Sequence, residues 1–277
     1  MSISVTVLVD DQVERGDGLL AEHGFSLLVE ASDRKVLFDT GQSDVFLGNA
    51  RRLGVDLDSL DAVVLSHGHY DHGGGLTRLL RSLGRLEVIA HPDAFIPRWH
   101  RRPGQQDRYI GLGFDARRLR GDGTALHLEA QAREIGPHLL TTGAIARTTD
   151  FECANPDFWV EANGQWRPDP LDDDQALIAR TREGLVVLLG CAHAGVTNTL
   201  HHAIRLTGDS RIRAVVGGLH LKDASPEVVD KTVAALREMD VARIVACHCT
   251  GFAARVTLYA AFGDGFVNGT VGLGLSF

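Results

Sequence analysis

Cysteine is scarce in this 277-residue sequence, and long apolar runs are missing. The four cysteines, Cys153, Cys191, Cys247 and Cys249, are too few and too unevenly spaced for a disulfide framework, so we expect free thiols. No stretch approaches the roughly 18 apolar residues that a membrane span needs, and the N-terminus lacks a basic segment followed by an apolar run. We therefore expect a cytoplasmic protein with no membrane partner.

Positive charge is also in short supply. Lysine and arginine total 28 against 36 aspartate and glutamate residues, which gives a formal net charge of −8. General electrostatic binding to nucleic acid needs the opposite balance, so no nucleic-acid partner is expected. Hydrophobic residues make up 44% of the chain, which is ample for a buried core.

Segments with strand periodicity alternate with helical segments in both halves of the chain. The strand "SVTVLVD" is followed by a predicted hairpin of "FSLLVEAS" and "KVLFDTG" around a polar turn at residues 32–34. Helices are predicted at residues 45–53, 76–83, 196–206, 226–239 and 251–261, between further strands. The simplest arrangement is an α/β fold, an αββα sandwich of two mixed sheets with outer helices.

The middle of the chain, about residues 97–172, has weaker periodicity and is rich in proline, glycine and arginine. We interpret it as an insertion over the rim of the sandwich, within a single domain that covers residues 1–277.

Four potential metal ligands fall within six positions of "LSHGHYDHGGGL", namely His67, His69, Asp71 and His72. The motif follows a buried strand, "DAVVLS", and precedes a helix. Residues two apart on an extended chain point the same way, so His67 and His69 can bind one cation, while Asp71 and His72 lie where the chain turns and can hold a second. Imidazole with carboxylate suits zinc best, with manganese or iron as alternatives.

The pattern H-x-H-x-D-H at a strand end resembles the signature of the metallo-β-lactamase fold superfamily. The segment "LFDTG" before this pattern and the segments "GCAHAG" and "HCTG" after it lie in the order that the family leads us to expect. Together with "DDQAL" and "GGLHL" they are similar to the branch of dihydropterin-ribofuranosylaminobenzene phosphate synthase-like hydrolases. The resemblance implies a supporting role for Asp39 behind the ligands and two further ligands, His193 and His248.

The sequence departs from the common family pattern at two places. Cys191 follows Gly190 where many members have a bridging aspartate, so a thiolate fills that place or the metals lack a protein bridge. The usual histidine before the preceding strand is absent, and His193 is expected to replace it. The predicted assignment for one or two divalent metals per chain places His67, His69 and His193 on the first, and Asp71, His72 and His248 on the second.

Two other features have open interpretations. His220, in "VVGGLHL", is either a histidine bonded to loop backbone or a substrate contact or proton donor, with a metal ligand as the less favoured alternative. Cys247 and Cys249 flank His248, but a C-x-C without a second pair is weak evidence for zinc, and core packing is favoured for both.

The implied chemistry is hydrolysis by metal-activated water of an ester, lactone, amide or phosphoester, with Asp71 orienting the water and accepting its proton. One alternative is transfer of a pterin-type group from a diphosphate ester. Another is a non-enzymatic, zinc-stabilised binding or redox-sensing protein that uses Cys191, Cys247 and Cys249. Product analysis and metal stoichiometry distinguish the three.

The segment "RWHRRPGQQDRY" concentrates arginine beside aromatic residues in an otherwise acidic chain. The non-functional interpretation of this segment is a solvated loop. Guanidinium groups also bind phosphate or carboxylate in a bidentate manner, so Arg101 and Arg102 are predicted to contact a small anionic substrate. No feature of the sequence indicates an oligomeric state.

Overall fold

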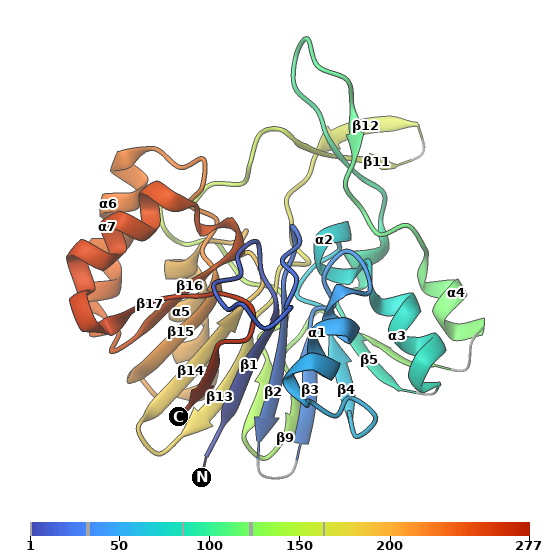
Figure 1. Cartoon of the computed structure of the whole chain (residues 1–277). Helices are drawn as coiled ribbons and strands as arrows, with labels where there is room; N and C mark the ends of the chain where they lie inside the picture. Colours follow the sequence, from blue (N-terminus) through green and yellow to red (C-terminus); the bar gives the residue numbers. More distant parts are fainter. Residues whose placement is uncertain (1, 32–33, 85, 122–123, 163) are drawn as a thin grey trace.

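The structure, a computed structural model, describes residues 2–31, 34–84, 86–121, 124–162 and 164–277. Two seven-stranded mixed sheets form the body of the protein (Figure 1). The first sheet has the order β18 (Gly274–Ser276), β1 (Ser4–Val9), β2 (Ser26–Ala31), β3 (Arg34–Phe38), β4 (Ala62–Val64), β5 (Glu87–Ala90) and β8 (Ala125–Leu128). The second has the order β17 (Phe266–Asn268), β16 (Ile244–Cys247), β15 (Ile212–Gly218), β14 (Gly184–Leu189), β13 (Leu177–Thr181), β10 (Leu139–Thr141) and β9 (Arg133–Gly136).

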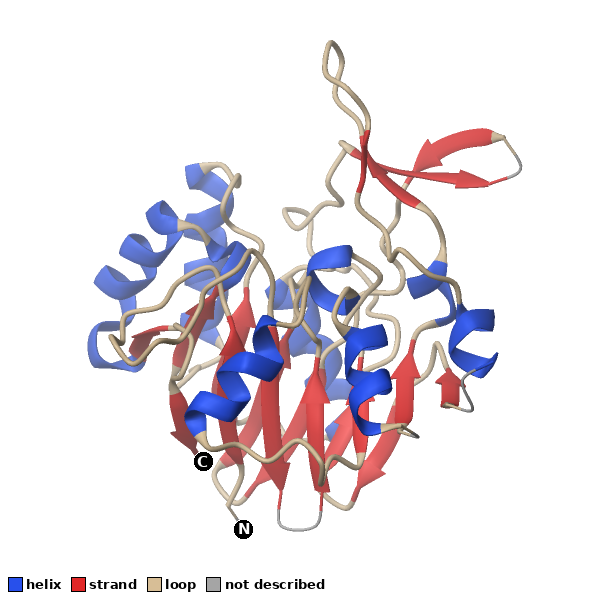
Figure 2. Ribbon diagram, turned by 45° about the vertical axis from the view of Figure 1, so that its right-hand side comes forward, coloured by secondary structure: helices blue, strands red, loops and turns tan. Residues whose placement is uncertain are grey.

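Helices cover the outer faces of both sheets (Figure 2). The helices α1 (Val45–Leu53), α2 (Tyr70–Gly73) and α3 (Leu76–Leu83) follow strands of the first sheet, and α4 (Ala116–Gly121) precedes its edge strand β8. Those of the second are α5 (Val196–Thr207), α6 (Pro226–Glu238) and α7 (Phe252–Phe262). Short 3-10 turns lie at η1 (Pro92–Phe95), η2 (His248–Thr250) and η3 (Gly263–Gly265). No helix among the described residues combines the length and apolar character that a membrane crossing requires.

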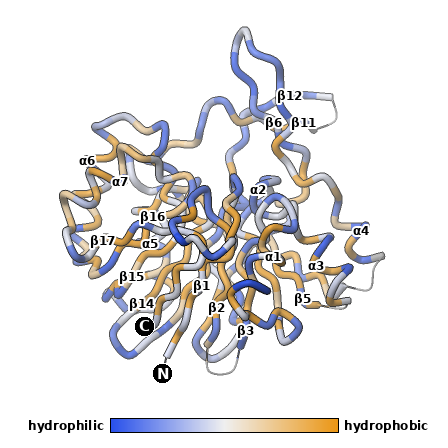
Figure 3. Tube along the Cα trace, in the orientation of Figure 1, coloured by the Kyte–Doolittle hydropathy of each residue, from blue (hydrophilic) through white to orange (hydrophobic). Residues whose placement is uncertain are grey.

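Three apolar layers hold the sandwich together, visible as the hydrophobic colour along the sheets in Figure 3. Val29 and Val186 belong to the layer between the two sheets, because successive side chains of a strand point to opposite faces. Leu28 packs outward in the cluster that includes α1 and α3, and Val187 packs outward in the cluster that includes α5, α6 and α7. The predicted αββα sandwich is therefore confirmed.

The strands nearest the metal-ligand motifs run in parallel, which brings their carboxyl ends to one edge. In the first sheet, β3, β4, β5 and β8 are parallel neighbours. In the second, β14, β15, β16 and β17 are parallel neighbours. The predicted hairpin is present as the antiparallel pair β2–β3, and residues 32 and 33 of its expected turn lie outside the described residues.

A third, four-stranded sheet rises above the sandwich (Figure 1). Its strands are β12 (Gln165–Pro168), β11 (Phe158–Ala162), β6 (Arg98–His100) and β7 (Arg108–Tyr109). The interval 97–172, expected to be one insertion, also contains β8, β9 and β10, which belong to the two main sheets. β8 and β9 form sheet edges and are only partly buried, which explains their weak periodicity.

Candidate metal centre

The candidate ligands follow the carboxyl ends of strands in both sheets. His67 lies three residues after β4, His193 four residues after β14, and His248 directly after β16. Asp39 directly follows β3. Loops at the carboxyl ends of parallel strands converge without disturbing the core, and here they bring residues up to 181 positions apart, His67 and His248, into one centre.

The first cluster consists of His67, His69 and His193, all of them buried. His67 Nε2 lies 3.0 Å from His69 Nδ1 and 3.2 Å from His193 Nε2. Three ring nitrogens therefore meet at one point, as the sequence assignment for a first metal requires.

The geometry of the first cluster fits a metal ion. Zinc–nitrogen bonds of 2.0–2.1 Å in a tetrahedron place the ligand nitrogens about 3.3 Å apart, close to the two separations above. The other ring nitrogens of two members, His69 Nε2 and His193 Nδ1, are buried and have no hydrogen-bond partner among the described residues. The facing nitrogens contact one another, while these outer nitrogens have no such contact, so His69 and His193 can each direct a neutral lone pair toward a shared metal.

Protonation also favours coordination at the first cluster. Burial lowers the pKa of His67, His69 and His193 well below the ordinary histidine value, and the neighbouring imidazoles add to the effect at His67 and His193. Neutral imidazole is the form that binds a metal.

The second cluster consists of Asp71, His72 and His248. His72 Nε2 lies 3.3 Å from His248 Nε2, and Asp71 Oδ2 lies 3.4 Å from His248 Nε2 and 4.0 Å from His72 Nε2. Asp39 Oδ2 lies 2.7 Å from His72 Nδ1, so the buried carboxylate accepts the ring proton and leaves Nε2 free to face the cluster. Ser66 Oγ donates to the same carboxylate oxygen and contacts His67 Nδ1, so Asp39 supports both clusters.

Two residues of the site were missed by sequence reasoning, Asp11 and His23. Asp11 lies 2.7 Å from His248 Nδ1 and 3.0 Å from His23 Nδ1, while His23 Nε2 lies 3.2 Å from Asp71 Oδ2. The signal that could have found Asp11 is its position just after β1. Both β1 and β3 are antiparallel to β2, so β1 and β3 run in the same direction and end at the same edge of the sheet. His23 lies in a loop with no motif.

In the second cluster, carboxylates and histidines of opposite charge stabilise one another. Burial alone would raise the pKa of Asp71 and Asp11, but contacts with His248 and with His72 or His23 lower both below the ordinary range. Burial lowers the pKa of His248, yet hydrogen bonds to Asp11 and Asp71 raise it well above the ordinary value. The second cluster is therefore an ion-paired arrangement even without a metal.

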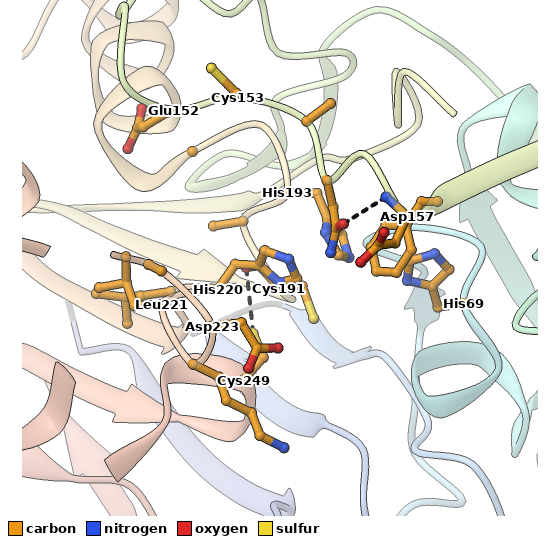
Figure 4. Close-up of a pocket in the computed structure, with 18 of the residues that line it drawn as sticks. His69, Glu152, Cys153, Asp157, Cys191, His193, His220, Leu221, Asp223 and Cys249 are labelled. Atoms are coloured by element: carbon orange, nitrogen blue, oxygen red, sulfur yellow. Dashed lines mark hydrogen bonds between the residues drawn. The ribbon is translucent and has the colours of Figure 1, made fainter. Parts of the chain in front are cut away.

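Cys191 lies between the two clusters. Its Sγ is 3.1 Å from His72 Nε2, and it lies within 4.8 Å of ligand atoms of both His67 and His248. Cys249 Sγ approaches the Cys191 carbonyl at 3.6 Å (Figure 4). Core packing was favoured for Cys247 and Cys249. Cys247 is fully buried between the sheets, whereas Cys249 lines the cavity.

His220 joins the site from the end of β15. Its ring lies 4.2 Å from the ring of His193, centroid to centroid, and both point into the same cavity (Figure 4). His220 Nδ1 is buried without a hydrogen-bond partner among the described residues, so a hydrogen bond from that atom to loop backbone does not account for the position of the ring. Burial lowers the pKa of His220, but its contact with Cys249 raises it above the ordinary value overall.

The backbone is strained at the same edge. Four non-glycine residues of the centre have positive φ, a conformation that costs about 1–3 kcal/mol each and often marks functional sites. They are Asp39 (62°), Ala192 (55°), His220 (52°) and His248 (43°).

A cavity of about 580 Å³ opens onto the centre and is lined by His69, Asp71, His193 and His220. The third sheet supplies one wall: the Phe158 ring lies 5.2 Å from that of His69 and 5.6 Å from that of His193.

The two arginines predicted to contact substrate lie in different places. Arg102 lines the cavity and pairs with Asp157 at 2.5 Å, and Arg108 lines it as well. Arg101 does not line it: its guanidinium lies 4.0 Å from the centroid of Trp166. Both residues follow the end of β6, where Arg102 turns toward Asp157 and Arg101 turns toward Trp166.

Comparison with known proteins identifies the family. The sequence pattern of the metallo-beta-lactamase superfamily matches residues 20–248. The chain belongs to this superfamily. Its members bind divalent metals, and the clusters above supply suitable ligands. A crystal structure described as a metal-dependent hydrolase of the beta-lactamase superfamily is 37% identical, with a TM-score of 0.84 over 99% of this chain and 98% of the other.

Two relatives come from Methanocaldococcus jannaschii. An uncharacterised protein is 31% identical over 269 residues, 97% of this chain and 98% of the relative. A second protein, named 7,8-dihydropterin-6-methyl-4-(beta-D-ribofuranosyl)-aminobenzene-5'-phosphate synthase, is 28% identical over 279 residues, 96% of this chain and 93% of the relative. The resemblance to this synthase noted in the sequence is thus confirmed.

Proposed function

We propose that the protein is a metal-dependent hydrolase acting on an ester, lactone, amide or phosphoester, with zinc as the metal. The observation that carries the proposal is the meeting of His67 Nε2, His69 Nδ1 and His193 Nε2 at separations that suit one metal ion. A divalent ion held there supplies an activated water at neutral pH. Asp71, His72 and His248 are the proposed ligands of a second ion.

Asp71 is the proposed acceptor of the water proton. It is the carboxylate that both faces the cavity and belongs to the second cluster. Contacts with His23 and His248 hold Oδ2 in place, so the group is oriented before substrate binds. His220, which lines the same cavity, is the proposed proton donor to the leaving group.

The substrate is proposed to be a small anionic molecule. Arg102 and Arg108 line the cavity on the side of the third sheet, and Lys222 lines it from the loop after β15. Phe158 presents an aromatic surface next to His69, against which a flat group of the substrate can pack. When the guanidinium groups bind an anionic group of the substrate, the bond to be hydrolysed is placed close to the imidazoles.

A second candidate is transfer of a pterin-type group from a diphosphate ester, supported by the 28% identical relative named as a synthase. The same metals would then bind diphosphate, and the group acceptor would be an organic molecule in place of water. A structural zinc or redox-sensing role has less support, because the ligand clusters open onto a cavity whereas structural sites are usually closed by four ligands.

The test is an activity screen with quantified metal. Wild-type protein loaded with zinc or manganese is assayed on lactones, phosphodiesters and thioesters with water as the sole acceptor, and bound metal is measured on the same sample. Turnover that follows metal content and stops on chelation supports the hydrolase. Absence of turnover on every class, with product and diphosphate formed only when a pterin-type diphosphate ester and an amine or arene acceptor are both added, favours the transferase. One closed zinc whose removal unfolds the chain contradicts both.

A further inference from the structure

We propose that the segment Asp173–Gln175 sets the geometry of the first metal cluster by holding the two ligand loops at a fixed separation, with Asp173 as its central positioning residue. The inference rests on the proposed metal function, since it concerns how those ligands are held. The segment precedes β13 and lies outside the two ligand clusters described above.

Asp173 joins the ligand loop of the first sheet to a buried arginine. Its Oδ2 accepts a hydrogen bond from the backbone N–H of Gly68 at 2.7 Å, and its Oδ1 accepts one from Arg98 Nη2 at 2.7 Å. Asp173 is fully buried and Arg98 is 1% exposed. Gly68 is the residue between His67 and His69, so this bond fixes the peptide that separates two ligands.

Close packing explains why Gly68 is glycine. A Cβ at this position would lie 1.9 Å from the Ala94 carbonyl oxygen and 2.4 Å from Arg98 Nη1. The ligand loop is therefore pressed against η1 and Arg98, while Asp173 holds the same peptide through its N–H group.

The next two residues complete the connection between the sheets. Asp174 Oδ2 accepts a hydrogen bond from the backbone N–H of Ala194, next to His193, at 2.8 Å. Gln175 donates from Nε2 to the Leu65 carbonyl at 2.8 Å and from its backbone N–H to the Ser66 carbonyl at 2.9 Å. One short segment thus contacts the loop that carries His67 and the loop that carries His193.

This connection matters because the first cluster draws ligands from both loops. A metal tolerates only small errors in ligand distance, and outer contacts that orient ligands typically change metal affinity by about 10–100-fold when they are lost. Asp173 does not touch a ring, so it acts through the backbone. Its role is to keep His67 and His69 at the correct distance from His193.

The experiment compares Asp173→Asn with a matched control, Asp169→Asn. Asp169 is also buried, accepts from Arg98 Nε at 2.7 Å and accepts from one backbone N–H, that of Leu171, at 2.9 Å. It does not contact a ligand loop through that bond. An asparagine at either position has one acceptor oxygen in place of two, so each variant loses one bond of the same kind.

Zinc affinity is measured by competition with a chelator, the visible absorption of the cobalt-loaded protein reports ligand geometry, and thermal melting reports stability. We expect both variants to lose similar stability. Asp173→Asn should weaken zinc at the first cluster by about 10–100-fold and alter the cobalt spectrum, while Asp169→Asn retains wild-type affinity and spectrum. Equal changes in the two variants, or no change in Asp173→Asn, overturn the inference.

A second variant keeps the test valid if Asp173→Asn fails to fold. Gln175→Met removes only the bond to the Leu65 carbonyl at similar volume, and we expect a smaller loss of zinc affinity with an altered cobalt spectrum. Unchanged affinity and spectrum in this variant overturn the inference. Failure of wild-type protein to bind zinc or cobalt overturns the proposed function itself, which is a distinct result.

Discussion

The two ligand clusters lie side by side but differ in how their charge is balanced. The first is built from three imidazoles with lowered pKa values, and two of its ring nitrogens have no partner among the described residues. The second surrounds His248 with the carboxylates of Asp11 and Asp71, which raise the pKa of His248.

The difference indicates what each cluster needs from a metal. In the first cluster, the three nitrogens that face one another belong to imidazoles with lowered pKa values, so they offer neutral lone pairs that a cation can bind. The second satisfies its groups through ion pairs and gains less from an added ion. We infer that the first cluster binds metal more tightly and that its geometry depends on the metal more strongly.

The largest effect is expected from His69→Ala, which removes one of three nitrogens from the first cluster. Metal at this cluster and hydrolytic activity should both be lost, because two remaining imidazoles do not form a stable site. The fold should remain, since His69 lies at the rim of the cavity and outside the apolar layers. Bound metal and circular dichroism are measured on one sample. Full metal retention would contradict the assignment of His69.

The pH dependence of the stability of the metal-free protein tests the role of Asp174, whose carboxylate holds the loop that carries His193. Burial raises the pKa of Asp174 to about 7 from its ordinary value of 3.8. At Asp174 the native state then holds more protons than the unfolded state between these values, so the contribution of this group to stability should fall as pH rises from about 4 to 7, by at most about 4 kcal/mol. The lowered pKa values of His67, His69 and His193 contribute in the opposite direction, so the Asp174 contribution is isolated by a variant.

Asp174→Asn should remove this contribution, so its stability relative to wild type should rise between pH 5 and pH 8, because the amide oxygen still accepts from Ala194 and the amide does not titrate. Melting temperatures of metal-free wild-type and variant protein at pH 5 and pH 8 make the comparison. Asp10, whose pKa burial raises to about 6, contributes in the same direction in both proteins. Parallel pH profiles would show that Asp174 does not carry the effect.

Cys191→Asp tests whether the position between the clusters acts as a bridge. A carboxylate there should tighten the second metal about tenfold, because it adds an anionic ligand near His72 and His248. Cys247→Asp is the control, since that thiol is equally buried but packs between the sheets, where an unpaired carboxylate destabilises the fold. Metal titration and melting temperature are measured for both. A lower melting temperature in Cys191→Asp without tighter binding favours a packed thiol.

The sequence predicted the sandwich correctly, and it drew attention to the histidine and aspartate motif, because both depend on local patterns. The runs ending at Phe38 and Leu189 are apolar on both faces, which is the signature of strands covered on both sides. The spacing of His67, His69 and His72 within six positions likewise marks them as candidate ligands without reference to distant residues.

What the sequence did not predict depends on contacts between distant segments. Asp11 reaches His248 only because β1 ends at the same edge as β16, and Asp173 reaches Gly68 across 105 positions. The edge strands β8 and β9 were included in the insertion because partial burial weakens their alternation. Such contacts follow from topology, which a single sequence specifies only indirectly.

The smallest effect is expected at the third sheet, where Arg101 and Arg102 are adjacent but face different surroundings. Arg102→Ala should raise KM for an anionic ester by about tenfold and leave a small neutral ester unchanged, because Arg102 lines the cavity. The effect is modest since Asp157 already pairs with Arg102. Arg101→Ala should change neither KM, because its guanidinium lies on Trp166 outside the cavity lining. KM and kcat are measured for both esters by steady-state kinetics. Equal losses of kcat/KM in the two variants would mean that these arginines act by stabilising the third sheet and do not select the substrate.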